Sequence, residues 1–200
     1  PFSVKQTKQL DAKKIREQLD TLSLQNSYDF FNENIRKFLV ANRQRYDYIS
    51  NEAMEYIRTM ADGVSLTEMF VSFSGGKDST VVSDLVLRAL GTQQVLHLYA
   101  DTTLEFPESA KYVKRFKTEH PKTLVITAKN KDKNFEELCE QLGPPSRVMR
   151  WCCTIFKTGA IQRKIQTLFK NQKRILTFYG IRRSESNSRN KYDRESDSPK

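Results

Sequence analysis

Apolar side chains recur every three or four residues over the first third of the chain, from Val4 to about Met60. This spacing places them on one side of a helix and predicts two or three amphipathic helices. Aromatic residues of the region fall largely at the same spacing, which is typical of core packing: Tyr28, Phe30, Phe31, Phe38, Tyr46, Tyr48 and Tyr56. We therefore expect a helical N-terminal extension over residues 1–64.

After Asp62-Gly63 the pattern changes, and short apolar runs alternate with helical spacing. Four runs have the length and composition of buried strands, at residues 69–73, 94–100, 124–127 and 175–179. Helices are predicted between them at 78–90, 108–120, 134–142 and 154–170. This alternation predicts an α/β domain over residues 65–200, with an open, mostly parallel sheet and helices on both faces. Ligands of such sheets bind at the carboxyl ends of the strands.

Charge is distributed unevenly along the chain. The formal net charge of the 200 residues is +10, and the last sixty residues, with fourteen basic and four acidic side chains, contain all of this excess. Such a concentration favours a polyanionic partner such as DNA or RNA, whereas a solvated basic surface is the alternative interpretation. We expect Arg163, Lys170 and Arg174 to lie on one side of a helix and its following turn.

Composition excludes some classes of protein. No stretch approaches the roughly 20 apolar residues of a membrane span, so no membrane partner is expected. Three cysteines, two of them adjacent, cannot form a disulfide framework, and no signal peptide is recognisable. We therefore expect a reducing, cytoplasmic setting. The chain begins with Pro1 and stops in a polar run without an apolar face, so we interpret it as a fragment of a longer protein.

The loop after the first predicted strand carries the strongest functional motif, Ser74-Gly75-Gly76-Lys77-Asp78-Ser79-Thr80, and leads directly into a helix. Two glycines let a ligand approach the backbone, and the first-turn N–H groups and the helix dipole favour an anion. The spacing is not that of a Walker A motif. A simple turn and helix cap is the alternative, but the strand–loop–helix context predicts a phosphate site.

Four blocks of sequence resemble the phosphoadenosine phosphosulfate reductase family of the PP-loop ATP pyrophosphatase superfamily: residues 74–81, 99–108, 157–160 and 180–189. The family includes the ATP-binding subunit of ATP sulfurylase and the ATP pyrophosphatases of DNA phosphorothioation. The resemblance implies an adenine nucleotide α-hydrolase-like fold. It also implies cleavage of ATP between the α- and β-phosphates, with adenylation of an acceptor and release of pyrophosphate, in sulfur metabolism or nucleic-acid sulfur modification.

The resemblance also implies roles for individual residues. Lys77, Asp78 and Asp101 are the expected catalytic residues, with Lys77 neutralising the leaving group. Asp101, at the end of the second predicted strand, is a candidate for Mg²⁺ binding, and capping of a turn is its alternative role. The nucleotide ATP would contact Ser74, Gly75, Gly76, Lys77, Asp78, Ser79, Thr80, Asp101, Lys157, Arg182, Arg183 and Arg189. Guanidinium groups suit bidentate contacts to phosphate.

Cys152 and Cys153 form a second candidate site. Paired cysteines bind an iron–sulfur cluster in some members of the family, and this pair would supply half of the ligands. Cys139 is expected to be a small buried hydrophobe, and His97 a satisfied residue of the sheet. Two other functions stay open at this point. One is a sulfonucleotide reductase, and the other is a nucleic-acid-binding module of a modifying complex with a further protein partner. The residues do not identify the acceptor.

Overall fold

The computed structural model describes residues 24–197, which divide after Ser50 into two compact units. In the first unit, α2 covers Leu24–Ala41, and α3, Arg43–Ala61, begins there and continues into the second unit. These are two of the helices that the spacing predicts; the part of the prediction before residue 24 lies outside the described residues. Large apolar side chains are exposed along α2, among them Phe30, Phe31 and Phe38.

The second unit contains a sheet of four strands, all parallel. The strands are β1 (Met69–Ser72), β2 (Leu96–Asp101), β3 (Val125–Lys129) and β4 (Leu176–Phe178), in the order β3-β2-β1-β4. In register, Val71 of β1 pairs with His97 of β2, which pairs with Val125 of β3. The predicted open parallel sheet is therefore confirmed. Each strand lies within two residues of its expected bounds.

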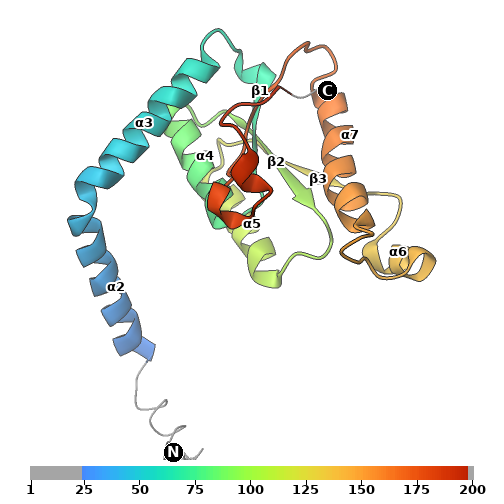
Figure 1. Cartoon of the computed structure of the whole chain (residues 1–200), viewed down its shortest axis with the longest axis horizontal. Helices are drawn as coiled ribbons and strands as arrows, with labels where there is room; N and C mark the ends of the chain where they lie inside the picture. The colour runs from blue at the N-terminus through green and yellow to red at the C-terminus, as the bar shows by residue number, and fades with distance from the viewer. Residues whose placement is uncertain (1–23, 198–200) are drawn as a thin grey trace, which may run out of the picture. The chain divides into compact units, whose positions relative to one another are not determined.

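Helices cover both faces of this sheet (Figure 1). On one face, α3 and α4 (Lys77–Leu90) pack on Met69 and Val71, and α5 (Pro107–Glu119) packs on Phe73 and Tyr99. On the other, α7 (Gly159–Leu168) packs on Phe70, Leu98 and Ala128. The alternation of side chains along each strand sends successive residues to opposite faces, so both faces of β1 are apolar.

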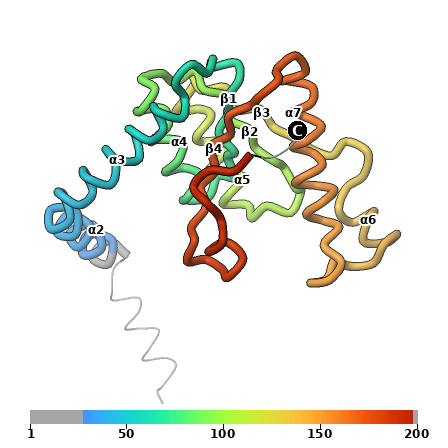
Figure 2. Tube along the Cα trace, turned by 45° about the horizontal axis from the view of Figure 1, so that its top comes forward, coloured from blue at the N-terminus to red at the C-terminus, as the bar shows by residue number. Residues whose placement is uncertain are grey.

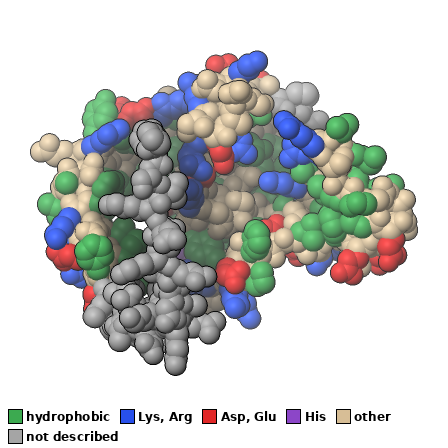
Figure 3. Space-filling view, turned by 60° about the horizontal axis from the view of Figure 1, so that its bottom comes forward, with side chains coloured by type: hydrophobic (Ala, Val, Ile, Leu, Met, Phe, Trp, Pro, Cys, Tyr) green, Lys and Arg blue, Asp and Glu red, His purple; other side chains and the backbone are tan. Residues whose placement is uncertain are grey.

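A fourth apolar cluster involves α6 (Phe135–Leu142) and the residues that follow it, between β3 and α7 in the sequence. Leu138, Trp151 and Phe156 are buried there, and the Trp151 indole donates to the Gly143 carbonyl at 3.2 Å. Exposed apolar side chains occur in α6 and in the segment that follows it: Leu142, Val148 and Met149. In Figure 3, hydrophobic side chains gather at the right-hand end of the view.

The helix predicted over 154–170 is present: the chain is helical without a break from Trp151 to Leu168. Its first part contains a π-helical turn, η2 (Cys153–Thr158), which the spacing did not predict, and α7 then ends at Leu168. A Cβ on Gly159 would lie 2.8 Å from the Thr154 carbonyl oxygen, so the absence of a side chain permits this wide turn. Of the three basic residues expected in one row, only Arg163 is helical, whereas Lys170 and Arg174 follow the end of α7.

After β4 the chain loops back over the second unit, as the red segment in Figures 1 and 2 shows. It contains two short 3₁₀ turns, η3 (Arg183–Glu185) and η4 (Arg189–Lys191). The Arg194 guanidinium lies 3.8 Å from the centroid of the Tyr56 ring and pairs with Glu52 at 2.6 Å. This polar end, which we expected to lack an apolar face, is thus docked by a cation–π contact and an ion pair instead of by apolar side chains of its own. Among residues 24–197, no helix is long and apolar enough to cross a membrane.

Candidate functional site

The loop between β1 and α4 has a geometry that requires a glycine at position 75. Gly75 has φ +73°, and a Cβ there would lie 2.6 Å from Cγ2 of Val113 on α5. Gly76 is the N-cap of α4 and has no side chain with which to cap the helix. The first-turn N–H groups of α4 therefore have no side-chain acceptor at the N-cap, and they face the mouth of the loop.

Hydroxyl groups hold this loop in shape. The buried Ser79 hydroxyl donates to the Gly76 carbonyl at 2.9 Å and accepts from the Ser74 amide at 3.2 Å. The Thr80 hydroxyl donates to the same Gly76 carbonyl at 3.0 Å and lies 3.1 Å from the Tyr112 hydroxyl of α5. Because these bonds close the loop on itself, Ser79 and Thr80 fix the position of the backbone donors. The Ser74 hydroxyl accepts from the Gly76 amide at 3.3 Å and is exposed.

A second segment, distant in sequence, packs against the same helix end. A Cβ on Gly180 would lie 2.8 Å from the carbonyl carbon and oxygen of Asp78. The chain leaving β4 therefore touches the first turn of α4 directly. Two residues later, Arg182 Nε donates to Asp78 Oδ2 at 3.1 Å. The structure thus brings together Asp78 and Arg182, which are 104 positions apart.

Further charged groups surround this contact. Glu185 pairs with Arg182 at 3.6 Å and also with Arg189, so it holds these two guanidinium groups side by side. Lys77 and Arg183 are exposed and have no ion pair or hydrogen-bond partner for their side chains within residues 24–197. Arg182 and Arg189 thus pair with Asp78 and Glu185, while Lys77 and Arg183 adjoin them in the sequence, which leaves a positive excess beside the helix N-terminus.

Asp101 lies at the carboxyl end of β2, as expected. Its Oδ1 accepts from the Thr103 amide at 2.9 Å, and its Oδ2 pairs with Lys129 Nζ at 3.3 Å. Asp101 thus caps a turn, the alternative role that the sequence allowed. It also lines a pocket of about 250 Å³ together with Tyr99, Thr103, Glu105, Ala110 and Val113. Because Val113 borders Gly75, this pocket lies next to the loop.

The phenol of Tyr99 illustrates the electrostatics of this pocket. Burial, followed by the nearby carboxylates of Glu105 and Asp101, raises the pKa of Tyr99 to about 12. The phenol is therefore neutral at physiological pH and acts as a hydrogen-bond donor or acceptor rather than as a charge.

Cys152, Cys153 and Lys157 lie in and just before the π-helical turn η2, which contacts β2. Cys139 and Cys152 both pack against the cluster of Leu138, Trp151 and Phe156, with Cys139 half-buried. Burial, and then the neighbouring Cys153 thiol, raises the pKa of Cys152, which disfavours the thiolate that binds metals. No three His, Cys, Asp or Glu side chains in the described chain are grouped as a metal site. Lys157 is exposed, without a described contact to the loop.

His97 is a satisfied core residue, as predicted. It is fully buried, with Nε2 2.7 Å from the Ser83 hydroxyl and Nδ1 2.9 Å from the Val95 carbonyl. Burial is the main reason that its pKa lies below the usual value for histidine. Because both ring nitrogens are occupied and no solvent reaches them, His97 does not contribute to the site.

Sequence reasoning missed three residues that shape the site. Gly180 stood in a recognised block but was not assigned a role, although a glycine directly after a buried strand signals close approach of backbone. Lys129 is the last residue of β3, and Asp101 is the last residue of β2. The register of these parallel strands places the two side by side, where they form an ion pair. Tyr112 gave no signal in the sequence, because its contact with Thr80 depends on how α5 packs.

An open parallel sheet with a glycine loop, first-turn helix amides and cations at one edge is the arrangement of a nucleotide-binding α/β protein. The family model of the phosphoadenosine phosphosulfate reductase domain matches residues 68–199. The chain therefore belongs to this family, and with it to the PP-loop superfamily. The loop between β1 and α4, Asp101 and the arginines at 182, 183 and 189 all lie within the matched region.

Relatives and solved structures with similarity to the chain include two uncharacterized proteins of Methanocaldococcus jannaschii. MJ0973 is 32% identical over 82% of this chain and MJ0066 is 32% identical over 81%. The chain spans only 39% and 32% of their lengths. The phosphoadenylyl-sulfate reductase of Candida auris in a phosphate complex has a TM-score of 0.43 and 13% identity, over 64% of this chain and 66% of that one. The NH₃-dependent NAD synthetase of Campylobacter jejuni has a TM-score of 0.48 and 17% identity, over 70% and 58%.

Proposed function

We propose that this protein binds ATP and transfers its adenylyl group to an acceptor, releasing pyrophosphate. The observation that carries the proposal is the junction of β1 and α4, where a side-chain-free N-cap exposes the first-turn amides beside Lys77. A helix N-terminus with a flexible cation next to it matches the outer phosphates of a nucleotide.

The reaction follows from where charge moves. An acceptor oxygen forms a bond to the α-phosphorus as the bond from that phosphorus to the bridging α–β oxygen breaks. The electron pair of the broken bond stays on pyrophosphate, so negative charge grows on the β-phosphate. Amides of the first α4 turn and the Lys77 ammonium would lie next to that charge and stabilise it.

Arg182 would take part by changing its partner. In the free protein its guanidinium is held by Asp78 at 3.1 Å, in a contact that is partly exposed and therefore weak. A polyphosphate at the loop offers more negative charge and a bidentate geometry to the same guanidinium. Asp78 would then position Arg182 at the mouth of the loop before the nucleotide arrives.

Asp101 is the proposed ligand for Mg²⁺, because its carboxylate lines the pocket beside Gly75 and Val113. The ion, when bound, would supply neutralisation of phosphate charge. Arg183, Arg189 and Lys157 are proposed as further nucleotide contacts, and Cys152 with Cys153 as half of an iron–sulfur site. The acceptor is proposed to be a sulfur-metabolism substrate or a nucleic acid. The surplus of positive charge after residue 141 supports a nucleic acid as a partner and does not by itself identify the acceptor.

Calorimetric titration with ATP and AMP tests the placement of the phosphates. Replacing Lys77 by alanine should weaken ATP binding about ten-fold or more, since a charge-assisted contact contributes roughly 1.5–3 kcal/mol, and it should change AMP binding little. Lys114→Ala is the matched control, because Lys114 is an exposed lysine on α5. Equal losses for ATP and AMP would contradict the proposal. Tighter binding of phosphoadenosine phosphosulfate than of ATP would favour a sulfonucleotide reductase instead.

A further inference from the structure

A second recess lies at the same edge of the sheet, directly after β3. It measures about 400 Å³ and is lined by polar and charged residues: Thr103, Lys129, Asn130, Lys131, Asp132, Lys133, Asn134 and Glu137. Its volume falls at the lower end of the range for small-molecule pockets. Because polar side chains line it, the recess suits a small hydrophilic ligand rather than an apolar one.

This recess adjoins the 250 Å³ pocket that is lined by Asp101, our proposed ligand for Mg²⁺. Thr103 lines both of them. Asp101 pairs with Lys129 of the recess at 3.3 Å, and the two residues are register partners at the ends of β2 and β3. A ligand at Lys129 would therefore lie next to the carboxylate that we propose for the Mg²⁺ of the nucleotide.

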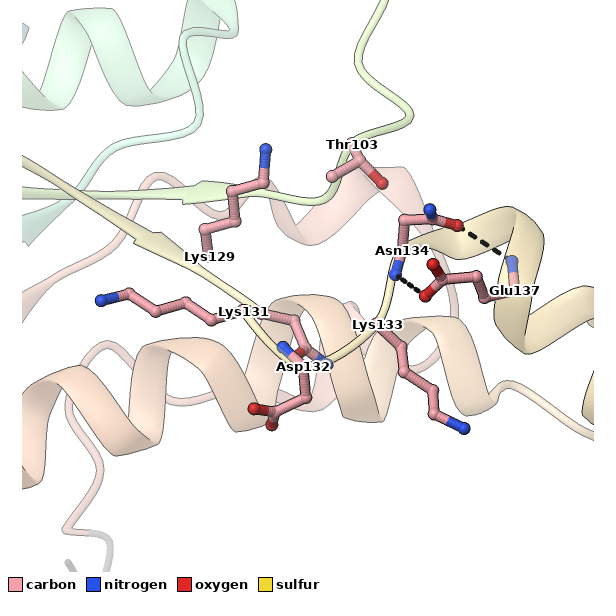
Figure 4. Close-up of a pocket in the computed structure, with 8 residues that line it drawn as sticks. Thr103, Lys129, Lys131, Asp132, Lys133, Asn134 and Glu137 are labelled. Atoms are coloured by element: carbon pink, nitrogen blue, oxygen red, sulfur yellow. Dashed lines mark hydrogen bonds between the residues drawn. The ribbon is translucent and has the colours of Figure 1, made fainter.

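The donors that face the recess are few. In Figure 4 the Lys129 side chain extends to the same side of the β3 strand as Thr103. The Lys131 and Lys133 side chains point away from Thr103 and Asn134. Lys133 is hydrogen-bonded to Gln141. The Asn134 Oδ1 atom accepts from the Glu137 amide at 2.9 Å, which leaves the Asn134 NH₂ group as a donor. Lys129 thus supplies the cation, with Thr103 and Asn134 as neutral donors.

Backbone strain at Thr103 supports a functional reason for this arrangement. Thr103 is the one described non-glycine residue with positive φ, at +65°, and a β-branched side chain is disfavoured there. The Asp101 carboxylate holds this conformation through the Thr103 amide. The strained turn thus places Thr103 where it lines both pockets.

We propose that the recess binds an oxyanion group of a small co-substrate, which takes the Lys129 ammonium from Asp101. This inference rests on the proposed function, and it names the class of acceptor. An oxyanion is already deprotonated, so its oxygen can form the bond to the α-phosphorus without a base, while the electron pair of the cleaved bond leaves with pyrophosphate. Carboxylate, sulfate and phosphate groups share this chemistry.

Protection of lysines from an amine-reactive label tests the site on the unaltered protein. Sulfate, phosphate and acetate are added in turn, with chloride at the same ionic strength as the reference. At least one oxyanion should reduce labelling of Lys129 three-fold or more and leave Lys131 unchanged. Equal labelling of Lys129 with every oxyanion and with chloride would overturn the inference.

Titration of variants with the protecting oxyanion provides the second test. Lys129→Met should weaken its binding about ten-fold or more, and the matched change Lys131→Met should have little effect. Asp101→Asn keeps an acceptor for the Thr103 amide but removes the competing charge, so it should tighten oxyanion binding about three-fold. Unchanged oxyanion affinity in Lys129→Met, or weaker binding in Asp101→Asn, would contradict the proposal.

ATP titration of the same samples distinguishes a failure of the proposed acceptor site from a failure of the proposed function. If wild-type protein binds ATP but no oxyanion protects Lys129, the recess is not the acceptor site and the proposed function stands. If it binds an oxyanion at Lys129 but no ATP, the proposed function fails, and the recess is an oxyanion site unrelated to adenylation.

Discussion

Substitution of Gly180 by alanine is the sharpest test of how the two halves of the site meet. The added methyl group would lie 2.8 Å from the carbonyl carbon and oxygen of Asp78 and 3.2 Å from the Ser79 amide nitrogen. All three atoms belong to backbone at the start of α4, so they cannot turn aside as a side chain could. The segment that carries Arg182 must therefore move away from the loop.

The expected magnitude follows from this overlap. Forcing one extra methyl group into a packed site costs about 1–3 kcal/mol of stability, and here the strain falls on the contact that positions Arg182. Loss of the guanidinium from the phosphate site should weaken ATP binding about ten-fold. AMP, which lacks the outer phosphates, should bind with little change.

Gly63→Ala is a suitable control for stability alone. Gly63 has φ +71°, so alanine is strained there by about 1 kcal/mol, but no atom lies within 4 Å of its Cβ position. Urea unfolding should record a loss of stability in both variants, and calorimetry should record weaker ATP binding only in Gly180→Ala. ATP affinity that is equal in Gly180→Ala and wild type would refute the role of this contact.

Two further predictions concern pH and polyanions. Because burial lowers the pKa of His97 in the folded state, stability should be constant above pH about 6.5 and fall as the pH decreases below it, where the unfolded chain takes up the proton first. The melting temperature should thus drop between pH 7 and pH 5 in wild type and drop less in His97→Gln; parallel profiles would contradict this assignment. If the basic C-terminal third contacts a nucleic-acid duplex, the logarithm of affinity should fall with the logarithm of salt concentration with a slope of about −3 or steeper. The double change Arg163→Glu with Lys170→Glu should abolish this binding while Lys111→Glu with Lys114→Glu does not, and no binding at low salt would leave only a solvated basic surface.

Local signals predicted the sheet and the loop well. The apolar run at 69–73 and the glycines that follow it are short-range features, so the strand, the loop and α4 could be placed from spacing alone. The assignment of His97 to the core followed from its position inside an apolar strand. These features depend on neighbours in the sequence rather than on tertiary packing.

Features that depend on distant contacts could not be predicted. The pairing of Asp101 with Lys129 requires the register of β2 and β3, and the fit of Gly180 against α4 requires the path of the chain after β4. The π-helical turn before α7 has the same spacing of apolar residues as a regular helix, so periodicity did not reveal it. Docking of Arg194 on Tyr56 depends on a cation–π contact, which the pattern of hydrophobic positions cannot predict.

The central claim is that the loop between β1 and α4 holds the outer phosphates of ATP. A crystal structure with α,β-methylene ATP, in which the bond to be cleaved is replaced by a stable one, tests it most directly. The account predicts that the β- and γ-phosphates lie within hydrogen-bond distance of the first-turn amides of α4 and of Lys77, with Arg182 turned from Asp78 to phosphate. A triphosphate bound elsewhere, with the Arg182–Asp78 contact unchanged, would contradict the account.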